Sequence, residues 1–392
     1  MKKFGKMVAG LGTALVVAAG AGWSHYGPRT GYAPLGARLA RIQQSPHYKD
    51  GQFHTLEPVT VETPVAGAKR ESTLKLWTDF LFGDHSALYP KQTLPHVKTN
   101  LRTLDPAANV LVWMGHSSFY LQLDGRHILV DPVFSGYASP LPLKNFRAYP
   151  GSDIYTPADM PDRIDVMVIS HDHWDHLDYD TQLALKDRVQ HVVTLLGIGE
   201  DFERWGFAPD RILEGDWYDA IPIDGGLTIT VLPSQHFSGR LLQRNGTEWG
   251  GFAFVTPRHK VYYSGDGGYG RHFADIGRQF GGFDLAILED GQYNVQWSKI
   301  HMMPEEVVQA AFDVRAKKFL PVHNSKFTLA RHPWQEPLER TAAALSRRRA
   351  AAGQGGEGQT AEGAAVPRLV TPLIGEALRI DDDSQTFTEW WK

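Results

Sequence analysis

Three imidazoles and one carboxylate lie within the short stretch His171 to His176, in the sequence Ser-His-Asp-His-Trp-Asp-His-Leu-Asp that begins at Ser170. His171 and His173 are two residues apart, so on an extended chain their side chains point to the same side and can bind one ion. Asp175 and His176 lie beyond the expected bend and can face a second ion. Imidazole and carboxylate ligands together suit zinc, with manganese or iron as alternatives. The competing interpretation is a surface histidine cluster or a helix start, but four ligand-type residues at this spacing rarely occur together by chance.

Other strand ends offer the remaining ligands for two metal shells. The motif itself follows the apolar stretch 166–169, which predicts a buried strand that stops at a polar turn. Ligand-type residues follow three further apolar stretches in the same manner, namely His236 after 227–232, Asp266 after 261–264 and His323 after 319–322. Each of them alone could equally be a hydrogen-bonded loop residue. Together with the first motif they predict a metal site at the ends of several strands.

The composition limits the class of protein. With 392 residues the chain can form one large domain or two, and charged residues at 21% and hydrophobic residues at 42% are typical of globular proteins. The net charge of −4 gives no support for a nucleic-acid partner. The chain has no cysteine, which excludes a thiolate nucleophile, a disulfide framework and a cysteine-based zinc site.

Residues 1–23 predict a signal peptide or an uncleaved N-terminal membrane anchor. Three lysines precede an apolar run at 7–23, and Ala19-Gly20-Ala21 offers a cleavage site. The run is short for a membrane span, and its glycines disfavour a buried N-terminal helix, which is the weaker interpretation. We therefore expect a protein of the bacterial envelope that is periplasmic or membrane-anchored facing the periplasm.

Residues 24–105 predict an irregular arm that packs on the core. Prolines punctuate this segment, and it lacks a strong strand pattern. An aromatic and apolar cluster at roughly helical spacing interrupts it, formed by Leu74, Leu76, Trp77, Phe80, Leu81 and Phe82. Packing against the main domain is the favoured interpretation of this cluster, and a lipid-facing or substrate-channel element is the alternative.

The remainder, 106–392, predicts a single core domain of short strands with helices among them. Strands are expected at 110–113, 119–123, 127–130, 165–169, 191–196, 227–232, 251–255, 261–264, 285–288 and 319–322, and helices at 179–188 and 304–316. The tract 345–366 predicts a flexible loop, and 369–380 predicts one or two closing strands. This order indicates an α/β protein with two mixed β-sheets between helices, an αββα sandwich.

The His-x-His-x-Asp-His motif closely resembles that of the metallo-β-lactamase-fold hydrolases. The resemblance covers roughly 109–337 and is densest at 115–118, 130–132, 233–236, 264–266 and 321–323, in addition to the motif. It implies that His171, His173 and His236 hold one ion. It further implies that Asp175, His176 and His323 hold a second ion, with Asp266 bridging the two. All seven ligand positions are matched.

Within the superfamily, the chain looks most similar to the N-acylphosphatidylethanolamine-hydrolysing phospholipase D group and its bacterial relatives. The supporting motifs are Asp-Pro-Val-Phe-Ser at 131–135, Ser-Gln-His-Phe at 234–237, Gly-Gly-Phe-Asp-Leu-Ala at 281–286 and His-Met-Met-Pro-Glu-Glu at 301–306. The likeness implies that His301 lies near the metals and contacts substrate. The long arm and the tract 345–366 depart from the group's pattern and bear on membrane docking. The L-ascorbate-6-phosphate lactonase group is a more distant likeness.

These residues predict a binuclear hydrolase with two Zn²⁺, or with Mn²⁺ or Fe²⁺ in their place. Two ions about 3.5–4 Å apart can share a water and lower its pKa until hydroxide exists at neutral pH. Asp175 is the candidate for orienting this bridging hydroxide and accepting its proton. His301 is the candidate for leaving-group protonation or substrate contact, with capping of a helix start as its alternative role. His116 is a candidate for supporting the ligands from outside.

The favoured function is a phosphodiesterase of the N-acylphosphatidylethanolamine phospholipase D type. Its substrate would be a small molecule or a phospholipid, with membrane association through the N-terminus. Hydrolysis of a lactone, a carboxylic ester or an amide at the same site is the second hypothesis. The third is a non-catalytic envelope protein that metals stabilise, and the complete ligand set argues against it because structural zinc sites are usually closed four-ligand cages.

Overall fold

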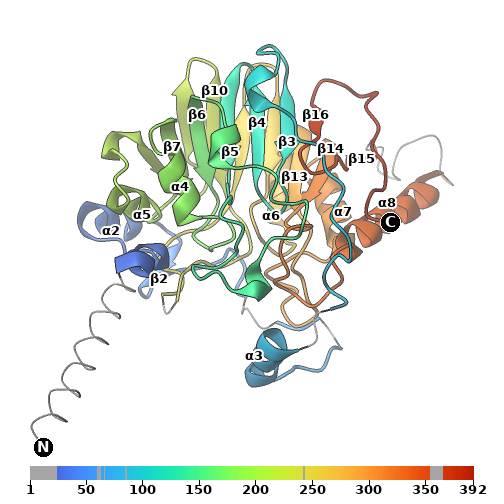
Figure 1. The fold of residues 1–392 in the computed structure, drawn as a ribbon, viewed down its shortest axis with the longest axis horizontal. Coiled ribbons are helices and arrows are strands. Elements are labelled where there is room, and N and C mark those ends of the chain that lie inside the picture. The colour runs from blue at the N-terminus through green and yellow to red at the C-terminus, as the bar shows by residue number, and fades with distance from the viewer. Residues whose placement is uncertain (1–23, 60–62, 66, 84–85, 242, 354–364) are drawn as a thin grey trace, which may run out of the picture.

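A computed structural model describes residues 24–353 and 365–392, apart from 60–62, 66, 84, 85 and 242. The expected signal or anchor at 1–23 lies outside these residues. The described chain forms two seven-stranded sheets with helices on their outer sides (Figure 1). This layering confirms the αββα sandwich expected from the sequence.

The first sheet is mixed. It has the order β16 (Ala377–Arg379), β3 (Val110–Trp113), β4 (Phe119–Leu123), β5 (Arg126–Val130), β6 (Ile164–Ile169), β7 (Val189–Leu195) and β8 (Ile212–Gly215). The strands from β16 to β5 pair antiparallel, and those from β5 to β8 pair parallel. Its helices are α4 (Tyr179–Leu185) and α5 (Gly199–Arg204).

The second sheet repeats this division. It has the order β15 (Arg368–Leu369), β14 (Ala316–Val322), β13 (Phe283–Glu289), β12 (Lys260–Tyr263), β11 (Gly251–Val255), β10 (Leu227–Leu232) and β9 (Ala220–Asp224). The strands from β15 to β12 pair parallel, and those from β12 to β9 pair antiparallel. Its helices are α6 (His272–Phe280), α7 (Pro304–Asp313) and α8 (Glu336–Gly353). Short 3₁₀ helices elsewhere are Gly27–Thr30, Leu101–Thr103, Lys144–Phe146, Pro157–Asp159 and Pro209–Arg211.

Apolar side chains fill the space between the sheets and under the helices. Phe119 of one sheet and Tyr263 of the other pack edge to face with ring centroids 5.3 Å apart. Phe273 of α6, Val308 of α7 and Leu345 of α8 are buried together over the outer face of the second sheet. Strands buried on both faces are continuous apolar runs, which explains why the sequence predicted so many of them.

The expected loop at 345–366 is wrong over its first part, because α8 continues to Gly353. Leu338, Thr341, Ala344 and Leu345 are buried at spacings of three and four, so the helix keeps a core-facing side where arginine and alanine dominate the sequence. Residues 354–364 lie outside the described part of the chain. Helices α5 and α6 and strands β8 and β9 were not expected; β9 is an edge strand that carries Pro222.

The arm, residues 24–105, contains α2 (Gly36–Ile42), the strand pair β1 (Tyr48–Lys49) and β2 (Gln52–Phe53), and α3 (Thr73–Phe82). Its first part is fixed to the core by polar contacts. Arg38 forms ion pairs with three glutamates of the core, Glu200, Glu203 and Glu214. The order within the arm is therefore created by contacts with distant residues, which the local sequence does not encode.

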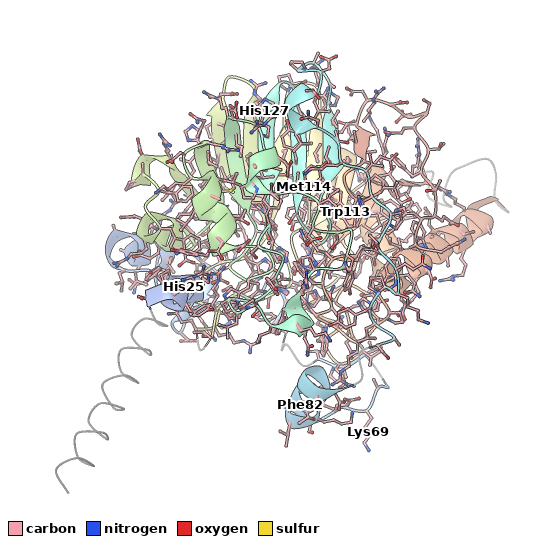
Figure 2. All side chains as sticks on the ribbon, viewed as in Figure 1. His25, Lys69, Phe82, Trp113, Met114 and His127 are labelled. Atoms are coloured by element: carbon pink, nitrogen blue, oxygen red, sulfur yellow. The ribbon has the colours of Figure 1, made fainter. Side chains whose placement is uncertain are left out.

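Helix α3 stands away from the body of the molecule (Figure 1). Leu74 is 74% exposed and Phe82 is 83% exposed, and Figure 2 shows Phe82 on this projecting helix. For these two side chains the favoured interpretation, packing against the main domain, is wrong. The side chains of Trp77, Phe80 and Leu81 lie outside the described residues. Within the described chain, no helix combines the length and the apolar character needed to cross a membrane.

Candidate metal centre

The candidate ligands follow the carboxyl ends of strands that run in one direction within each sheet. In the first sheet, His116 follows β3, Asp131 follows β5 and the histidine motif follows β6. In the second sheet, the residues are His236 after β10, Asp266 after β12, Glu289 at the end of β13 and His323 after β14. Ligand sites of α/β proteins commonly lie outside such carboxyl ends. The structure brings the side chains of both sheets together there.

His171, His173 and His236 form the first group of ligand atoms. His171 Nε2 lies 2.8 Å from His173 Nδ1, and His236 Nε2 lies 3.3 Å from the same nitrogen. All three nitrogens lie within 4.8 Å of one another, so a single ion could contact all of them. The β6 strand end positions the first two, and the turn after β10 brings the third from the opposite sheet.

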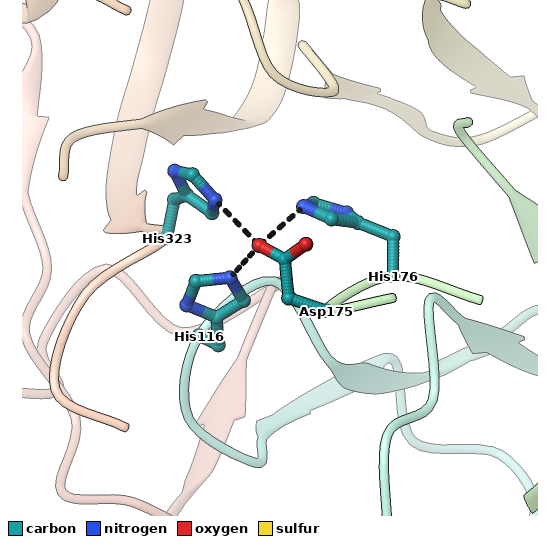
Figure 3. A group of neighbouring side chains, drawn as sticks. All are labelled: His116, Asp175, His176 and His323. Atoms are coloured by element: carbon teal, nitrogen blue, oxygen red, sulfur yellow. Dashed lines mark hydrogen bonds and ion pairs between the residues drawn. The ribbon is translucent and has the colours of Figure 1, made fainter. Parts of the chain in front are cut away.

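Asp175, His176 and His323 form the second group, and His116 joins it. Figure 3 shows the Asp175 carboxylate among the three imidazoles. Asp175 Oδ2 lies 2.8 Å from His116 Nε2, 3.4 Å from His323 Nε2 and 3.6 Å from His176 Nε2. His116 thus contacts a candidate ligand directly, and its expected role outside the ligand shell stays a prediction.

Asp266 lies between the two groups. Its Oδ2 is 3.0 Å from His323 Nε2 and 3.2 Å from His176 Nε2. The same oxygen is 3.8 Å from His171 Nε2 and 3.8 Å from His236 Nε2. The structure therefore brings all seven sequence-predicted ligands together, with one carboxylate oxygen facing both groups.

The second ring nitrogen of most of these imidazoles has its own partner. His171 Nδ1 lies 3.0 Å from Ser170 Oγ, and His176 Nδ1 lies 2.9 Å from Asp131 Oδ2. The partners on the opposite sheet are the Ile300 carbonyl oxygen, 3.0 Å from His236 Nδ1, and Glu289 Oε1, 3.4 Å from His323 Nδ1. Such partners fix the tautomer and orientation of metal-binding histidines, so that Nε2 is left to bind.

Within the seven candidate ligands, two buried polar atoms make no hydrogen bond to the described residues, His176 Nε2 and Asp266 Oδ1. Buried polar atoms without partners are uncommon in folded proteins, and a bound ion is one explanation for them. Both atoms belong to the candidate ligand set. The imidazole and carboxylate donors therefore fit a divalent metal ion of the zinc, manganese or iron type.

The charges of the cluster agree with this fit. Burial alone would raise the pKa of Asp266, but His176 and His323 hold this pKa well below its usual range. Burial alone would lower the pKa of His176, but Asp266 and Asp175 raise it to about 10. The carboxylates are thus compensated by protonated imidazoles in the protein alone. A bound cation would supply the same positive charge and release the protons.

His301 adjoins the cluster and is held by Glu289. His301 Nδ1 lies 2.9 Å from Glu289 Oε1, and Glu289 Oε2 accepts a hydrogen bond of 2.9 Å from the Met302 N–H. A ring nitrogen of His301 also lies within 4.8 Å of ligand atoms of His236 and Asp266. Glu289 is fully buried, so its contacts fix the imidazole of His301 beside the candidate metal ligands.

Sequence reasoning missed Asp131, Glu289 and Arg240. Glu289 follows directly on an expected strand, as the ligands do, and that position could have indicated it. Asp131 Oδ2 also accepts hydrogen bonds from Ser170 Oγ at 2.6 Å and from the Tyr263 hydroxyl at 2.7 Å. Arg240 carried no local signal, because its contacts are long-range.

Arg240 joins the arm to the histidine motif. Its buried guanidinium donates to the backbone oxygens of Asp172 and Leu177, which both lie within the stretch 170–178 that carries the motif. The same group donates at 2.9 Å to the backbone oxygen of Arg29 in the arm. One side chain therefore fixes the ligand loop and the start of the arm relative to each other.

Comparison with known proteins gives concordant results. The model of a family described as Beta-lactamase superfamily domain matches residues 126–324. An uncharacterised protein of Mycobacterium tuberculosis is 41% identical over 321 residues, covering 80% of this chain and 84% of that protein. The N-acyl-phosphatidylethanolamine-hydrolyzing phospholipase D 1 of Caenorhabditis elegans is 31% identical over 230 residues, covering 54% of this chain and 62% of that protein. The solved structure of Igni18, a metallo hydrolase from Ignicoccus hospitalis, has a TM-score of 0.50 and 20% identity, covering 69% of this chain and 97% of that chain.

Proposed function

This chain belongs to the β-lactamase superfamily as a metal-dependent hydrolase, and from that premise we propose that it is a zinc-dependent phosphodiesterase acting on a phospholipid of the N-acylphosphatidylethanolamine type. The observation that carries the proposal is the position of Asp266 Oδ2, which faces two separate groups of ligand atoms. This arrangement supports two metal ions in place of one.

The first ion would be held by His171, His173 and His236, the second by Asp175, His176 and His323, and Asp266 would contact both. When bound, Zn²⁺ would lower the pKa of a coordinated water to make hydroxide available at neutral pH, and would neutralise charge that develops on the phosphate oxygens. The fixed orientation of the imidazoles supports this role, since little rearrangement would accompany binding.

Asp175 would accept a proton from the attacking water. Burial alone would raise the pKa of Asp175, but the neighbouring His176, with His116 and His323, holds this pKa well below its usual range. The carboxylate is therefore ionised at neutral pH, as a proton acceptor must be.

His301 would protonate the leaving oxygen. Because Nδ1 faces Glu289 Oε1 at 2.9 Å, Nε2 is the nitrogen left for substrate. The Glu289 carboxylate would hold Nδ1 and so orient the ring with Nε2 toward the substrate. Glu289 thus acts through His301 as a positioning residue.

Two observations support a lipid substrate. The relatives from Caenorhabditis elegans and Saccharomyces cerevisiae, at 31% and 30% identity, are named as N-acyl-phosphatidylethanolamine-hydrolyzing phospholipases D. The exposed Leu74 and Phe82 on α3 offer apolar side chains to a lipid surface. Membrane association through residues 1–23 and a location in the bacterial envelope are part of the same proposal.

The test is hydrolysis of N-acylphosphatidylethanolamine in mixed micelles by the zinc-loaded full chain, with the products identified by mass spectrometry. We expect phosphatidic acid and the N-acylethanolamine, and no products from the Asp266→Ala variant. Wild-type protein with bound metal but no such products would overturn the phospholipid assignment. Lactones, carboxylic esters and amides would then be the substrates to assay, because the same site could hydrolyse them.

A further inference from the structure

Residues 25–32 of the arm lie against the histidine motif, and we refer to them as the arm start. The indole N–H of Trp174, inside the motif, donates at 2.8 Å to the backbone oxygen of Arg29. The buried guanidinium of Arg240 donates to the same oxygen at 2.9 Å. The Arg29 side chain forms an ion pair of 2.5 Å with Asp180 of α4, the helix that follows the motif. The arm start is therefore bound to the core at the motif itself.

Trp174 stands between a ligand of the first group, His173, and a ligand of the second, Asp175. The chain turns sharply at this point, because the N–H groups of His176 and Leu177 both donate to the His173 backbone oxygen, at 3.1 and 2.8 Å. Trp174 is joined by a peptide bond to each of the two ligands. A contact that fixes its indole to the arm start therefore also restricts the backbone of this turn.

Arg240 joins both ends of the turn to the arm start. Its guanidinium donates to the backbone oxygens of Asp172, which precedes His173, and of Leu177, which follows it. Its third acceptor is the oxygen from the arm start, and among the described residues it forms no ion pair. A buried charged donor that loses its acceptor is left with the cost of its desolvation. Displacement of the arm start would therefore weaken the contacts of Arg240 with the turn.

His173 is the candidate ligand whose ring depends most on the position of its backbone. Hydrogen-bond partners outside the ligand set hold the rings of the other four histidine ligands, His171, His176, His236 and His323. The Nδ1 atom of His173 faces ligand nitrogens of its own group, and among the described residues its Nε2 makes no hydrogen bond. Contact with the Phe237 ring at 4.6 Å restricts the imidazole but supplies no polar partner. The turn must therefore place this ligand.

We propose that the arm start completes the metal centre by holding Trp174 and Arg240, which fix the turn that places His173 for the first ion. Both are positioning residues, because they act on the ligand through the backbone. The inference rests on the two-ion centre of the proposed function. Ligands that are already held lose less conformational freedom when an ion binds, so the first ion should bind more weakly once the arm start is displaced. The second ion should respond less, since side-chain hydrogen bonds hold Asp175 and His176.

Trp174→Phe keeps the aromatic ring and removes its hydrogen bond to the arm start. Competition between the full chain and a chelator for Zn²⁺ should show one ion bound about tenfold more weakly, and the other changed less than about threefold. Co²⁺ in place of Zn²⁺ identifies the weakened ion, because its visible absorption bands should be those missing from His236→Ala, which lacks a first-group ligand. Trp390→Phe is the matched control, since Trp390 is another half-buried indole that donates to a backbone oxygen, and it should bind both ions as the wild type does.

Gly31→Ala displaces the arm start from within the arm. Gly31 has a φ of 80°, and a Cβ there would lie 3.3 Å from Arg240 Cδ. Gly51→Ala is the control for backbone strain, because Gly51 has a φ of 81° with open space around it. We expect Gly31→Ala to weaken the same ion about tenfold, and Gly51→Ala to leave both ions unchanged. Combined with Trp174→Phe, the loss should stay near about tenfold and not reach about a hundredfold, because both changes break one link.

Unchanged affinity for both ions in Trp174→Phe and Gly31→Ala would overturn the proposal, and so would losses that multiply in the double variant. An equal loss of both ions, with a lower melting temperature of the metal-free protein, would show a merely structural contact and also overturn it. These measurements need no turnover. Two bound ions without hydrolysis of N-acylphosphatidylethanolamine would reject the proposed substrate and keep the positioning role. Hydrolysis by the wild type, with unchanged metal affinities in the variants, would do the reverse.

Discussion

On the core side of the candidate site, buried imidazoles are held through their second ring nitrogens, whereas on the arm side exposed arginines line an open cavity beside His236. His176 is fully buried and bound by Asp131, while Arg70 and Arg244 are exposed. Ligand geometry requires fixed side chains, and recognition of a substrate substituent tolerates mobile ones. The comparison teaches that the two sides should respond differently to substitution. Variants of the buried imidazole cluster should lose bound metal and kcat, whereas variants of the arm beside this cavity should raise KM.

The largest effect is expected from Asp266→Ala. This change removes the carboxylate that faces both ligand groups, so bound metal should be lost and kcat/KM should fall about 1,000-fold or more. Metal analysis by mass spectrometry, hydrolysis of N-acylphosphatidylethanolamine and circular dichroism check the three consequences, with the fold expected to survive. Asp187→Ala, at an exposed aspartate, is the control. Full activity in Asp266→Ala would refute the assignment of the ligands.

Glu289→Gln should be next in size. The amide keeps an acceptor for the Met302 N–H but loses the charge that orients His301, so kcat should fall about 10- to 100-fold. KM and the melting temperature should change little. Glu339→Gln, at an exposed glutamate of α8, should behave as the wild type. A change in KM with kcat unchanged would contradict the role given to Glu289.

Gln296→Ala tests how the attachment of the arm to the core affects substrate binding. It removes the two hydrogen bonds that hold Lys69 and Glu71, which together contribute about 1–3 kcal/mol to fixing the arm. We expect KM to rise about fivefold to tenfold with kcat and bound metal unchanged, and the backbone amides of this segment to exchange hydrogen faster. Gln190→Ala, at a glutamine whose side chain donates to the nearby Arg188 backbone oxygen, is the control. A fall in kcat with unchanged KM would show that this part of the arm serves the chemistry and not the substrate.

The strands of the core and the candidate ligands at their ends were predicted from the sequence far better than the arm was, for a physical reason. Strands β3, β4, β10 and β11 have the expected bounds, because a strand that is buried on both faces shows as an apolar run. The seven candidate ligands follow such runs, so the strand ends point to them. The charge network that supports them was less visible, since Asp131 and Glu289 are single acidic residues whose partners, His176 and His301, lie in turns elsewhere in the chain.

The arm was beyond local prediction. Its shape depends on pairs such as Arg38 with Glu214, which lie 176 residues apart in sequence. The exposed Leu74 and Phe82 of α3 also contradict the expectation that these two side chains pack on the core, because apolar spacing is the same for a helix that faces the core and one that faces outward. In the core, the sequence also did not predict the backbone conformation at three strand ends. His116, Asp131 and His323 adopt left-handed conformations there, with φ of 55°, 40° and 64°.

The smallest effect on activity is expected at Asp201, where the arm meets helix α5 of the core, and the effect there is on stability. This residue is buried, accepts the Tyr32 N–H of the arm at 2.7 Å and lies near Arg240. Burial raises the pKa of Asp201 to about 7, and Arg240 only partly opposes the rise. The unfolded carboxyl has a pKa near about 3.9, so between about pH 4 and 7 the folded protein binds more protons than the unfolded chain. The free energy of unfolding should therefore fall as pH rises through this window, by at most about 4 kcal/mol.

Asp201→Asn should remove this dependence, because the amide oxygen still accepts the Tyr32 N–H but carries no charge. The variant should gain stability relative to the wild type between pH 5 and pH 8 in urea unfolding, and Asp210→Asn, at an exposed aspartate, should not. Taking the difference between variants at each pH cancels the titration of the metal cluster, which both proteins share. A gain of the same size at both pH values would mean that Asp201 is already ionised at pH 5, so that the Tyr32 N–H of the arm is held by a carboxylate compensated by Arg240 and not by a neutral acid.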